Sequence, residues 1–379
     1  MTLMVRIRTG RCRHKGLMAT LLYAVLLTGC GGQGEAEGEG LALVGEPRTS
    51  QGLALDTQAL AEPRGVLSNL AIETGPTPHQ VVMPDGTPLP LRRWGPAPEA
   101  GEAPSAVVIG VHGFNDHAGS FLPTAAALVP DDVAVYAWDQ RGFGASHQRG
   151  RWPGTEQLLS DARWVIDQVR ARYPDTPVHL VGLSMGGAIV GLLQASESPP
   201  PVSSGVLVGP AFWGTQAMPW YQRAGLWIVK RLAPGLTLSG RDLGVEPTDD
   251  SAVMRQLASD PRRIWETRVD AMAGVSDLMD AALAAVPDLH GGPTFILIAG
   301  EDEVIPASAA CAMFRRLPPT QRWRTAYYPA GYHMLTRFSG SDAVLADVRR
   351  FLSDADAPLP SGAEVDRDEG LEQTCAGSS

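Results

Sequence analysis

A serine between two glycines is the first feature of the sequence that could do chemistry. Ser184 stands in Gly182-Leu-Ser-Met-Gly186, between an apolar run over 178–184 and a stretch of small residues. Glycines at these two positions allow a sharp turn from a strand into a helix, which would project the Ser184 hydroxyl at the edge of a sheet. This context favours a nucleophilic serine over a serine in an ordinary turn.

A serine hydroxyl becomes a strong nucleophile only when a base removes its proton and an acid orients that base. Of the eight histidines, His333 is the last and follows the final predicted core strand. The acid should follow the predicted strand over 294–299, where three acidic residues stand in succession. We expect Asp302 to orient the histidine, with Glu301 as the alternative.

Attack on a carbonyl group also needs backbone N–H donors for the negative charge that develops on the oxygen. One donor would be the N–H of Met185, at the start of the helix after the nucleophile, where the helix dipole favours an anion. The other would be the N–H of Phe114, in the loop after another predicted strand. His112 and His117 in this loop are expected to order it rather than to bind a metal, and no metal or organic cofactor is expected.

Short apolar runs alternate with helical segments along the middle of the chain, and these elements must position the candidate residues. Such runs suit strands covered on both faces, and their alternation with helices predicts an α/β fold with a mostly parallel central sheet flanked by helices. A hairpin is expected over 80–94, a helix over 155–173, and a mostly helical cap at about 210–292, inserted between core strands. The core strands are expected over 106–112, 133–139, 178–184, 206–209, 294–299 and 325–328.

Five motifs stand in order along this part of the chain. They are His112-Gly-Phe-Asn-Asp-His, Trp138-Asp-Gln-Arg-Gly-Phe-Gly-Ala-Ser, Gly182-Leu-Ser-Met-Gly-Gly, Asp302-Glu-Val-Ile-Pro and Gly331-Tyr-His. Together they resemble the α/β-hydrolase fold family, most of all its monoacylglycerol lipase and lysophospholipase group, known in domain terms as the serine aminopeptidase S33 type. The resemblance implies an eight-stranded sheet, a helical cap and a triad of Ser184, Asp302 and His333. It also implies that Asp139 and Arg141 anchor a loop and take no part in catalysis.

The N-terminal part of the chain has the pattern of an export signal. Residues 1–29 contain five basic residues, no acidic residue and an apolar run of 12 residues, too short to cross a bilayer but suited to a signal peptide. The run ends in Leu27-Thr-Gly-Cys30, which resembles the bacterial lipobox. We expect a lipid on Cys30, in a protein exported to the bacterial envelope and anchored to a membrane, with the periplasmic side favoured. An ordinary secretory signal with an incidental cysteine is the alternative.

The remaining boundaries follow from composition. Residues 30–77 are rich in Gly, Glu and Pro and are expected to form a flexible spacer before a hydrolase domain over 78–353. Residues 354–379 are acidic and rich in Pro and Gly, and are expected to be a disordered tail.

The four cysteines exclude a disulfide scaffold, although Cys311 and Cys375 could either pair or remain separate thiols. A net charge of −10, with no basic stretch in the mature chain, excludes a nucleic-acid binder.

The expected function is hydrolysis of carboxylic esters, with monoacylglycerols, lysophospholipids or similar single-chain lipids as substrates. Aromatic residues at the start of the cap suit an acyl chain, so Trp213, Trp220 and Tyr221 are candidates for lining the pocket, or for the cap's own core. The stretch over 218–232 could instead face a membrane.

Two other functions remain open at this point. A catalytically silent binding lipoprotein is one of them, although an ordered set of serine, acid and histidine argues against it. The other is an S33-type aminopeptidase, whose cap would need acidic residues to bind a substrate ammonium group. The candidates for that role are Asp242, Glu246, Asp249 and Asp250.

Overall fold

The computed structural model describes most of the chain after residue 78. The described residues are 79–96, 103–213, 215, 220–240, 244–318 and 323–375. The expected signal peptide, the spacer and the lipid attachment site at Cys30 lie outside them and stay predictions. None of the helices in the described ranges combines the length and the apolar character that a membrane span requires.

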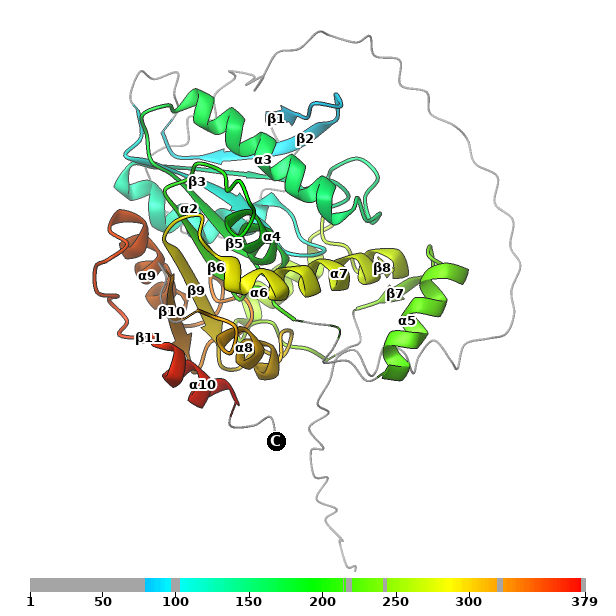
Figure 1. The fold of residues 1–379 in the computed structure, drawn as a ribbon. Helices are drawn as coiled ribbons and strands as arrows, with labels where there is room; N and C mark the ends of the chain where they lie inside the picture. The colour runs from blue at the N-terminus through cyan, green and yellow to red at the C-terminus, as the bar shows by residue number, and fades with distance from the viewer. Residues whose placement is uncertain are drawn as a thin grey trace, which may run out of the picture.

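A nine-stranded sheet runs through the centre of the molecule, in the order β1-β2-β4-β3-β5-β6-β9-β10-β11 (Figure 1). All neighbouring pairs from β4 to β10 are parallel, and the outer pairs are antiparallel. This arrangement confirms the expected mostly parallel sheet. The strands are β1 (His79–Val82), β2 (Pro88–Trp94), β3 (Ala106–Val111), β4 (Val133–Trp138), β5 (Val178–Leu183), β6 (Ser204–Val208), β9 (Thr294–Ala299), β10 (Trp323–Tyr328) and β11 (Glu364–Val365).

Helices cover both faces of this sheet, which explains why its inner strands are apolar at nearly every position. On β3, Val107 and Ile109 belong to the core on one face, while Val108 belongs to the core on the other. The first core is completed by α3, α4, α7 and α8, and the second by α2 and α9. These helices are α2 (Leu122–Leu128), α3 (Thr155–Arg172), α4 (Met185–Gln194), α7 (Val269–Ala285), α8 (Ala307–Phe314) and α9 (Ser341–Ser353).

The chain between β6 and β9 forms the insertion that the sequence predicted as a cap. It is mostly helical, but it also contains a short antiparallel pair, β7 with β8, which the sequence analysis did not anticipate. Helix α7 packs back on α4, and α5 packs on α7, so that α5 lies at the margin of the molecule (Figure 1). The further elements of the insertion are α5 (Trp220–Leu232), β7 (Thr237–Ser239), α6 (Ser251–Ser259) and β8 (Glu266–Arg268).

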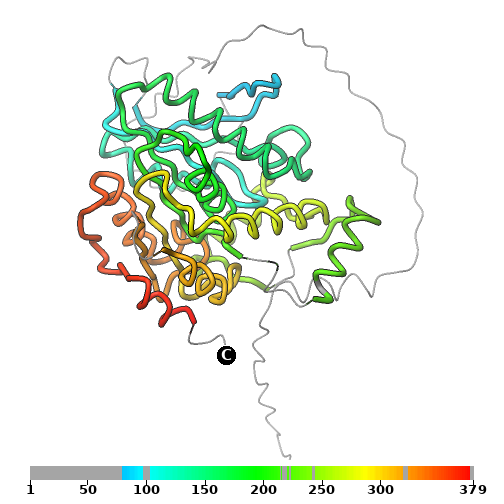
Figure 2. Tube along the Cα trace, viewed as in Figure 1, coloured from blue at the N-terminus to red at the C-terminus, as the bar shows by residue number. Residues whose placement is uncertain are grey.

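The segment after α9 is folded, so the expectation of a disordered tail is wrong for 354–375. Strand β11 pairs with β10 and adds a ninth strand to the eight that the resemblance implied. Helix α10 (Arg367–Cys375) then packs against α8, as Figure 2 shows for the last part of the described chain. The composition of this segment did not indicate that it folds, because its charged residues have specific partners. Arg324, for example, donates two hydrogen bonds of 2.6 Å to the Glu364 carboxylate.

A disulfide between Cys311 of α8 and Cys375 of α10 resolves the question that the sequence left open. We expect Cys375→Ser to lower the free energy of unfolding by about 4 kcal/mol, because the bond closes a loop with a sequence separation of 64 residues. Urea unfolding of the variant and the wild-type protein measures the difference. Reduced wild-type protein and a variant lacking both cysteines should show the same loss as the single variant, and an unchanged free energy would contradict the prediction.

Candidate active site

Ser184 lies at a strained turn between β5 and α4. Its backbone has φ 53° and ψ −113°, a conformation that side-chain-bearing residues rarely adopt and that marks functional sites. The neighbouring glycines allow the chain to approach itself closely. A Cβ on Gly186 would lie 1.9 Å from the backbone oxygen of Val111, and a Cβ on Gly182 would lie 2.3 Å from the backbone oxygen of Gly186. Both positions therefore require glycine.

Three side chains from different parts of the sequence form one hydrogen-bonded chain. His333 Nε2 lies 3.0 Å from Ser184 Oγ, and His333 Nδ1 lies 2.8 Å from Asp302 Oδ2. The other carboxylate oxygen of Asp302 accepts hydrogen bonds of 2.8 Å from the N–H groups of Val304 and Ile305. These two bonds fix the carboxylate so that Oδ2 is directed at the imidazole.

The pair of Asp302 and His333 is shielded from water, with side-chain exposures of 7% and 9%. Glu301, the alternative acid, has an exposed side chain, and its backbone N–H donates to the oxygen of Gly331 at 2.9 Å. The geometry thus places Asp302, and not Glu301, against the histidine.

Two backbone N–H groups lie beside Ser184 and are available to an incoming oxygen. The N–H groups of Met185 and Phe114 donate no hydrogen bond to any described residue. Met185 begins α4, whose N-terminal end favours negative charge. The loop that holds Phe114 passes close to the serine, since a Cβ on Gly113 would lie 3.4 Å from Ser184 Cβ. This arrangement can hold a carbonyl oxygen that becomes negatively charged.

His112 orders the start of this loop. Its Nδ1 donates to the oxygen of Gly113 at 2.8 Å, and its Nε2 accepts from the N–H of Gln140 at 3.0 Å. The Gln140 side chain returns a hydrogen bond of 2.8 Å to the backbone oxygen of His112. Burial lowers the pKa of His112, which keeps the ring neutral in this bonding pattern.

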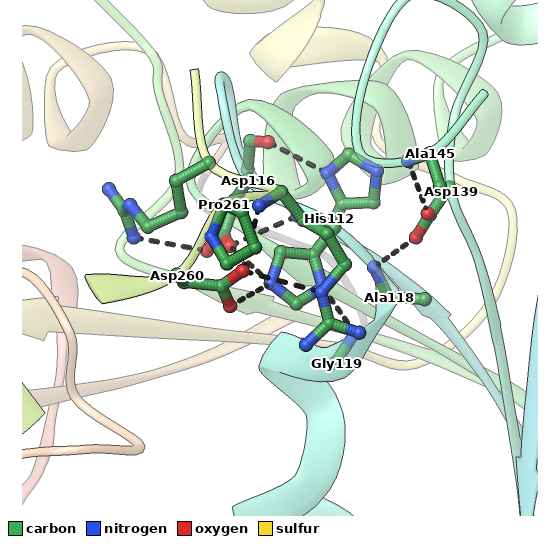
Figure 3. Close-up of polar contacts among 12 residues, drawn as sticks. His112, Asp116, Ala118, Gly119, Asp139, Ala145, Asp260 and Pro261 are labelled. Atoms are coloured by element: carbon green, nitrogen blue, oxygen red, sulfur yellow. Dashed lines mark hydrogen bonds and ion pairs between the residues drawn. The ribbon is translucent and has the colours of Figure 1, made fainter. Parts of the chain in front are cut away.

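Asp139 and Arg141 act as anchors, in agreement with the structural role that the resemblance implied. The two Asp139 oxygens accept hydrogen bonds of 2.8 Å from the N–H groups of Ala118 and Ala145 (Figure 3). Arg141 makes two hydrogen bonds to Asp161, at 2.9 and 3.1 Å, and these raise the pKa of Arg141 above its usual range. Neither side chain bonds to Ser184 or His333.

A buried ionic cluster holds the far end of the loop. His117 Nε2 lies 2.8 Å from Asp260 Oδ2, and the two side chains are 3% and 1% exposed. The Asp260 carboxylate also accepts from the N–H of Arg262 at 2.8 Å, and Asp116 pairs with Arg263 at 3.7 Å (Figure 3). Burial alone would raise the pKa of Asp260, but His117 and Arg262 hold it well below its usual range. Asp260 could not be identified from the sequence, because it follows His117 by 143 residues and no local motif links the two.

The three aromatic candidates for the substrate pocket differ in how far they are buried. Trp213 is half-buried and packs against the core that contains α4. Trp220 and Tyr221 of α5 are 78% and 54% exposed, so the structure does not enclose them in a pocket, and their contact with a substrate stays a prediction. Helix α5 lies at the margin of the molecule and turns these rings toward solvent. In the described ranges no cluster of three or more His, Cys, Asp or Glu side chains is arranged to bind a metal ion.

Comparison with known proteins yields one family and several relatives. Residues 102–337 match the family model described as serine aminopeptidase, S33. The chain is 26% identical to the monoglyceride lipase of Mus musculus, over 75% of this chain and 93% of the relative. It is also 26% identical to the monoacylglycerol lipase of Mycolicibacterium smegmatis, over 66% of this chain and 88% of the relative.

The solved structures show the same fold. A soluble variant of monoglyceride lipase from Saccharomyces cerevisiae, in complex with a substrate analog, superposes with a TM-score of 0.62 at 18% identity, over 76% of this chain and 98% of that one. The family match covers more than half of the chain, and the sheet, the insertion and the order of the motifs agree with it. The chain therefore belongs to the serine aminopeptidase S33 family and has the α/β-hydrolase fold.

Proposed function

We propose that the protein is a serine hydrolase that cleaves carboxylic esters. The observation that carries the proposal is the hydrogen-bonded chain from Ser184 through His333 to Asp302, at the carboxyl ends of the parallel strands. A partly buried serine, histidine and acid held in this order have one well-known chemical use, which is acyl transfer through the serine oxygen. The similarity to monoglyceride lipases supports an ester as the bond that is cleaved.

In the proposed mechanism, Ser184 Oγ attacks the ester carbonyl carbon while His333 Nε2 takes the hydroxyl proton. Asp302 Oδ2 accepts the hydrogen bond from His333 Nδ1 and stabilises the imidazolium. The N–H groups of Phe114 and Met185 bind the negative oxygen of the tetrahedral intermediate. When the intermediate collapses, the proton on His333 passes to the leaving alcohol. Water then repeats the sequence on the acyl-enzyme, releasing the acid and restoring Ser184.

We infer that the substrates are single-chain lipids, such as monoacylglycerols or lysophospholipid-like esters. Two of the relatives are named for the hydrolysis of monoacylglycerols. The inserted cap between β6 and β9 carries apolar and aromatic residues, which suit an acyl chain better than a charged peptide.

The aminopeptidase alternative is less favoured, because two of its candidate acids have structural tasks. Asp249 accepts hydrogen bonds from the N–H and the hydroxyl of Ser339, at 2.9 and 2.5 Å. Asp250 caps α6 by accepting from the N–H of Ala252 at 2.7 Å. Both carboxylates are thus engaged within the protein and not free to bind a substrate ammonium group. The other two candidates are Glu246, which is exposed, and Asp242, which lies outside the described residues.

A substrate series separates esters from peptides. We expect p-nitrophenyl esters of increasing chain length to be cleaved with a kcat/KM at least about tenfold higher than that of aminoacyl p-nitroanilides, a difference of about 1.4 kcal/mol in transition-state stabilisation. Initial rates followed at one wavelength suffice for both classes, because both release a chromophore. Monoacylglycerol hydrolysis, followed by titration of the released acid, then tests the lipid class. Faster cleavage of the anilides would show that the aminopeptidase alternative is correct.

A further inference from the structure

A cavity of about 360 Å³ lies on the face of the sheet that α2 and α9 cover. We call it the α2–α6 cavity, because α2 and α6 form its two long sides and the start of α9 adds a third. Its volume lies within the range of small-molecule pockets, roughly 300–1,000 Å³. Ser184, Asp302, His333 and Phe114 do not line it, so it is separate from the candidate active site.

The long walls of the α2–α6 cavity are apolar. Leu122 and Pro123 line it from α2, Val253 and Leu257 from α6, and Leu345 from α9. Helix α6 has nine residues, which at 1.5 Å per residue gives a wall of about 13 Å. A groove of this length and composition suits an extended hydrocarbon chain.

Arginine side chains lie at the inner end of the cavity, together with the Asp260 carboxylate. Arg337 and Gly119 line it, and Arg262 Nη2 lies 3.8 Å from the position that a Cβ on Gly119 would take. Both terminal nitrogens of Arg262 are buried without a hydrogen-bond partner. Burial lowers the pKa of Arg337, and the nearby carboxylates of Asp116 and Asp260 offset this only in part. Gly119 and Asp260, both labelled in Figure 3, each form a hydrogen bond with the His117 ring.

The ionic cluster at this end holds more positive than negative charge. Two carboxylates, Asp116 and Asp260, stand among the guanidinium groups of Arg262, Arg263 and Arg337. His117 aside, these three guanidinium groups exceed the two carboxylates by one charge. Guanidinium groups that lack partners in a region shielded from water are most strongly stabilised by a carboxylate or phosphate oxygen.

Three acidic residues line the cavity, and two of them, Asp250 and Asp342, lie away from this end. The third, Asp260, belongs to the ionic cluster and pairs with His117 and Arg262. Asp250 caps the N-terminus of α6, whereas Asp260 follows its C-terminus, so the length of α6, about 13 Å, separates them. Asp342 is exposed at the start of α9. The cavity therefore has Asp250 and Asp342 toward solvent, Arg337 with the Asp260 carboxylate at its inner end, and apolar walls in between.

We propose that the α2–α6 cavity binds a fatty acid, an amphiphile with one carboxylate and an unbranched apolar chain. The carboxylate contacts Arg337, and the chain lies between α2 and α6. This proposal does not depend on the proposed function, because no residue of the candidate active site forms the cavity. If the protein does hydrolyse lipid esters, the ligand belongs to the same chemical class as its acid product.

Photo-crosslinking of the full-length protein locates the site directly. The probe is decanoic acid with a diazirine on its chain, used with the Ser184→Ala variant so that no ester chemistry interferes. We expect mass spectrometry to find the crosslinks in peptides covering α2 and α6, and excess decanoate to compete for them. Crosslinks found only in peptides that contain position 184 or His333, in the candidate active site, would overturn the proposal. That outcome would not bear on whether the wild-type protein is a hydrolase.

Two variants test the two halves of the site by titration calorimetry with decanoate. Arg337→Met removes the charge, and Ala126→Trp fills the cavity from α2 without changing the ionic cluster; each should weaken binding at least about tenfold. Arg315→Met, at an exposed position on another face, is the control and should bind as the wild type does. Decanol should bind at least about tenfold more weakly than decanoate to the wild type, because it carries no charge. Wild-type affinity in the Ala126→Trp variant, or equal binding of decanol and decanoate, would overturn the proposal.

Discussion

Replacement of Ser184 by alanine is expected to lower kcat for ester hydrolysis by roughly 10⁶-fold, because it removes the atom that attacks the carbonyl group. The residual rate should come from the oxyanion donors and substrate binding alone. The change deletes one oxygen at the β5–α4 turn and leaves the glycines that permit the turn in place. The rate is measured with a p-nitrophenyl ester, and a fluorophosphonate probe reports on the nucleophile independently. The probe should label the wild-type protein and not the variant.

The neighbouring region offers a matched control. Ser198 is exposed just beyond α4, and Ser198→Ala should keep both the rate and the labelling of the wild type. Circular dichroism and a thermal melt show whether the Ser184→Ala variant is folded. A wild-type protein that does not react with the probe, or a folded Ser184→Ala variant that retains its rate, would refute a serine-based mechanism.

Asp302→Asn is expected to lower kcat by about 10⁴-fold, because an amide at this position stabilises the wrong imidazole tautomer. The hydrogen bond of 2.8 Å from His333 Nδ1 requires an acceptor, and two N–H groups already hold the other oxygen of Asp302. An asparagine can meet those N–H groups only by presenting its NH₂ group to His333. The predicted loss is therefore in kcat, with little change in KM, and both are measured with a p-nitrophenyl ester.

Glu301→Gln is the control for this variant, and it also decides between the two acids that the sequence left open. Glu301 precedes Asp302 directly, carries the same charge and is exposed. We expect Glu301→Gln to retain kcat within about threefold, in line with the small effects of surface substitutions. Equal losses in the two variants would mean that the charge of the loop, and not one oriented carboxylate, supports the reaction.

Much of the fold could be predicted because the inner strands are buried on both faces. Burial on both sides selects apolar residues at consecutive positions, so the strand ending at Val111 and the one ending at Leu183 stand out as short runs. The candidate nucleophile could be found for a similar reason. The β5–α4 turn requires glycine at two positions, which leaves a local trace around Ser184.

The rest depends on contacts between residues far apart in the sequence. The histidine pairs with an acid 31 residues earlier, and only the order of the motifs and the strand pattern suggested Asp302. The pair of His117 and Asp260 joins a loop to the insertion, and no motif surrounds Asp260. The C-terminal segment was misjudged because composition reports average polarity, whereas its stability comes from one disulfide and a few paired charges.

Strand β11 has a consequence for how far the domain can be shortened. The outer side of β10 is paired only by β11, which comes later in the chain than every other described strand. A protein trimmed at residue 353, where the sequence alone suggests the end of the domain, would expose the unpaired backbone of β10 and the Phe314 ring that packs against Gly370. An uncovered sheet edge beside an apolar patch is a template for pairing between molecules. The last short strand therefore protects the sheet against self-association, and the functional unit extends to Cys375.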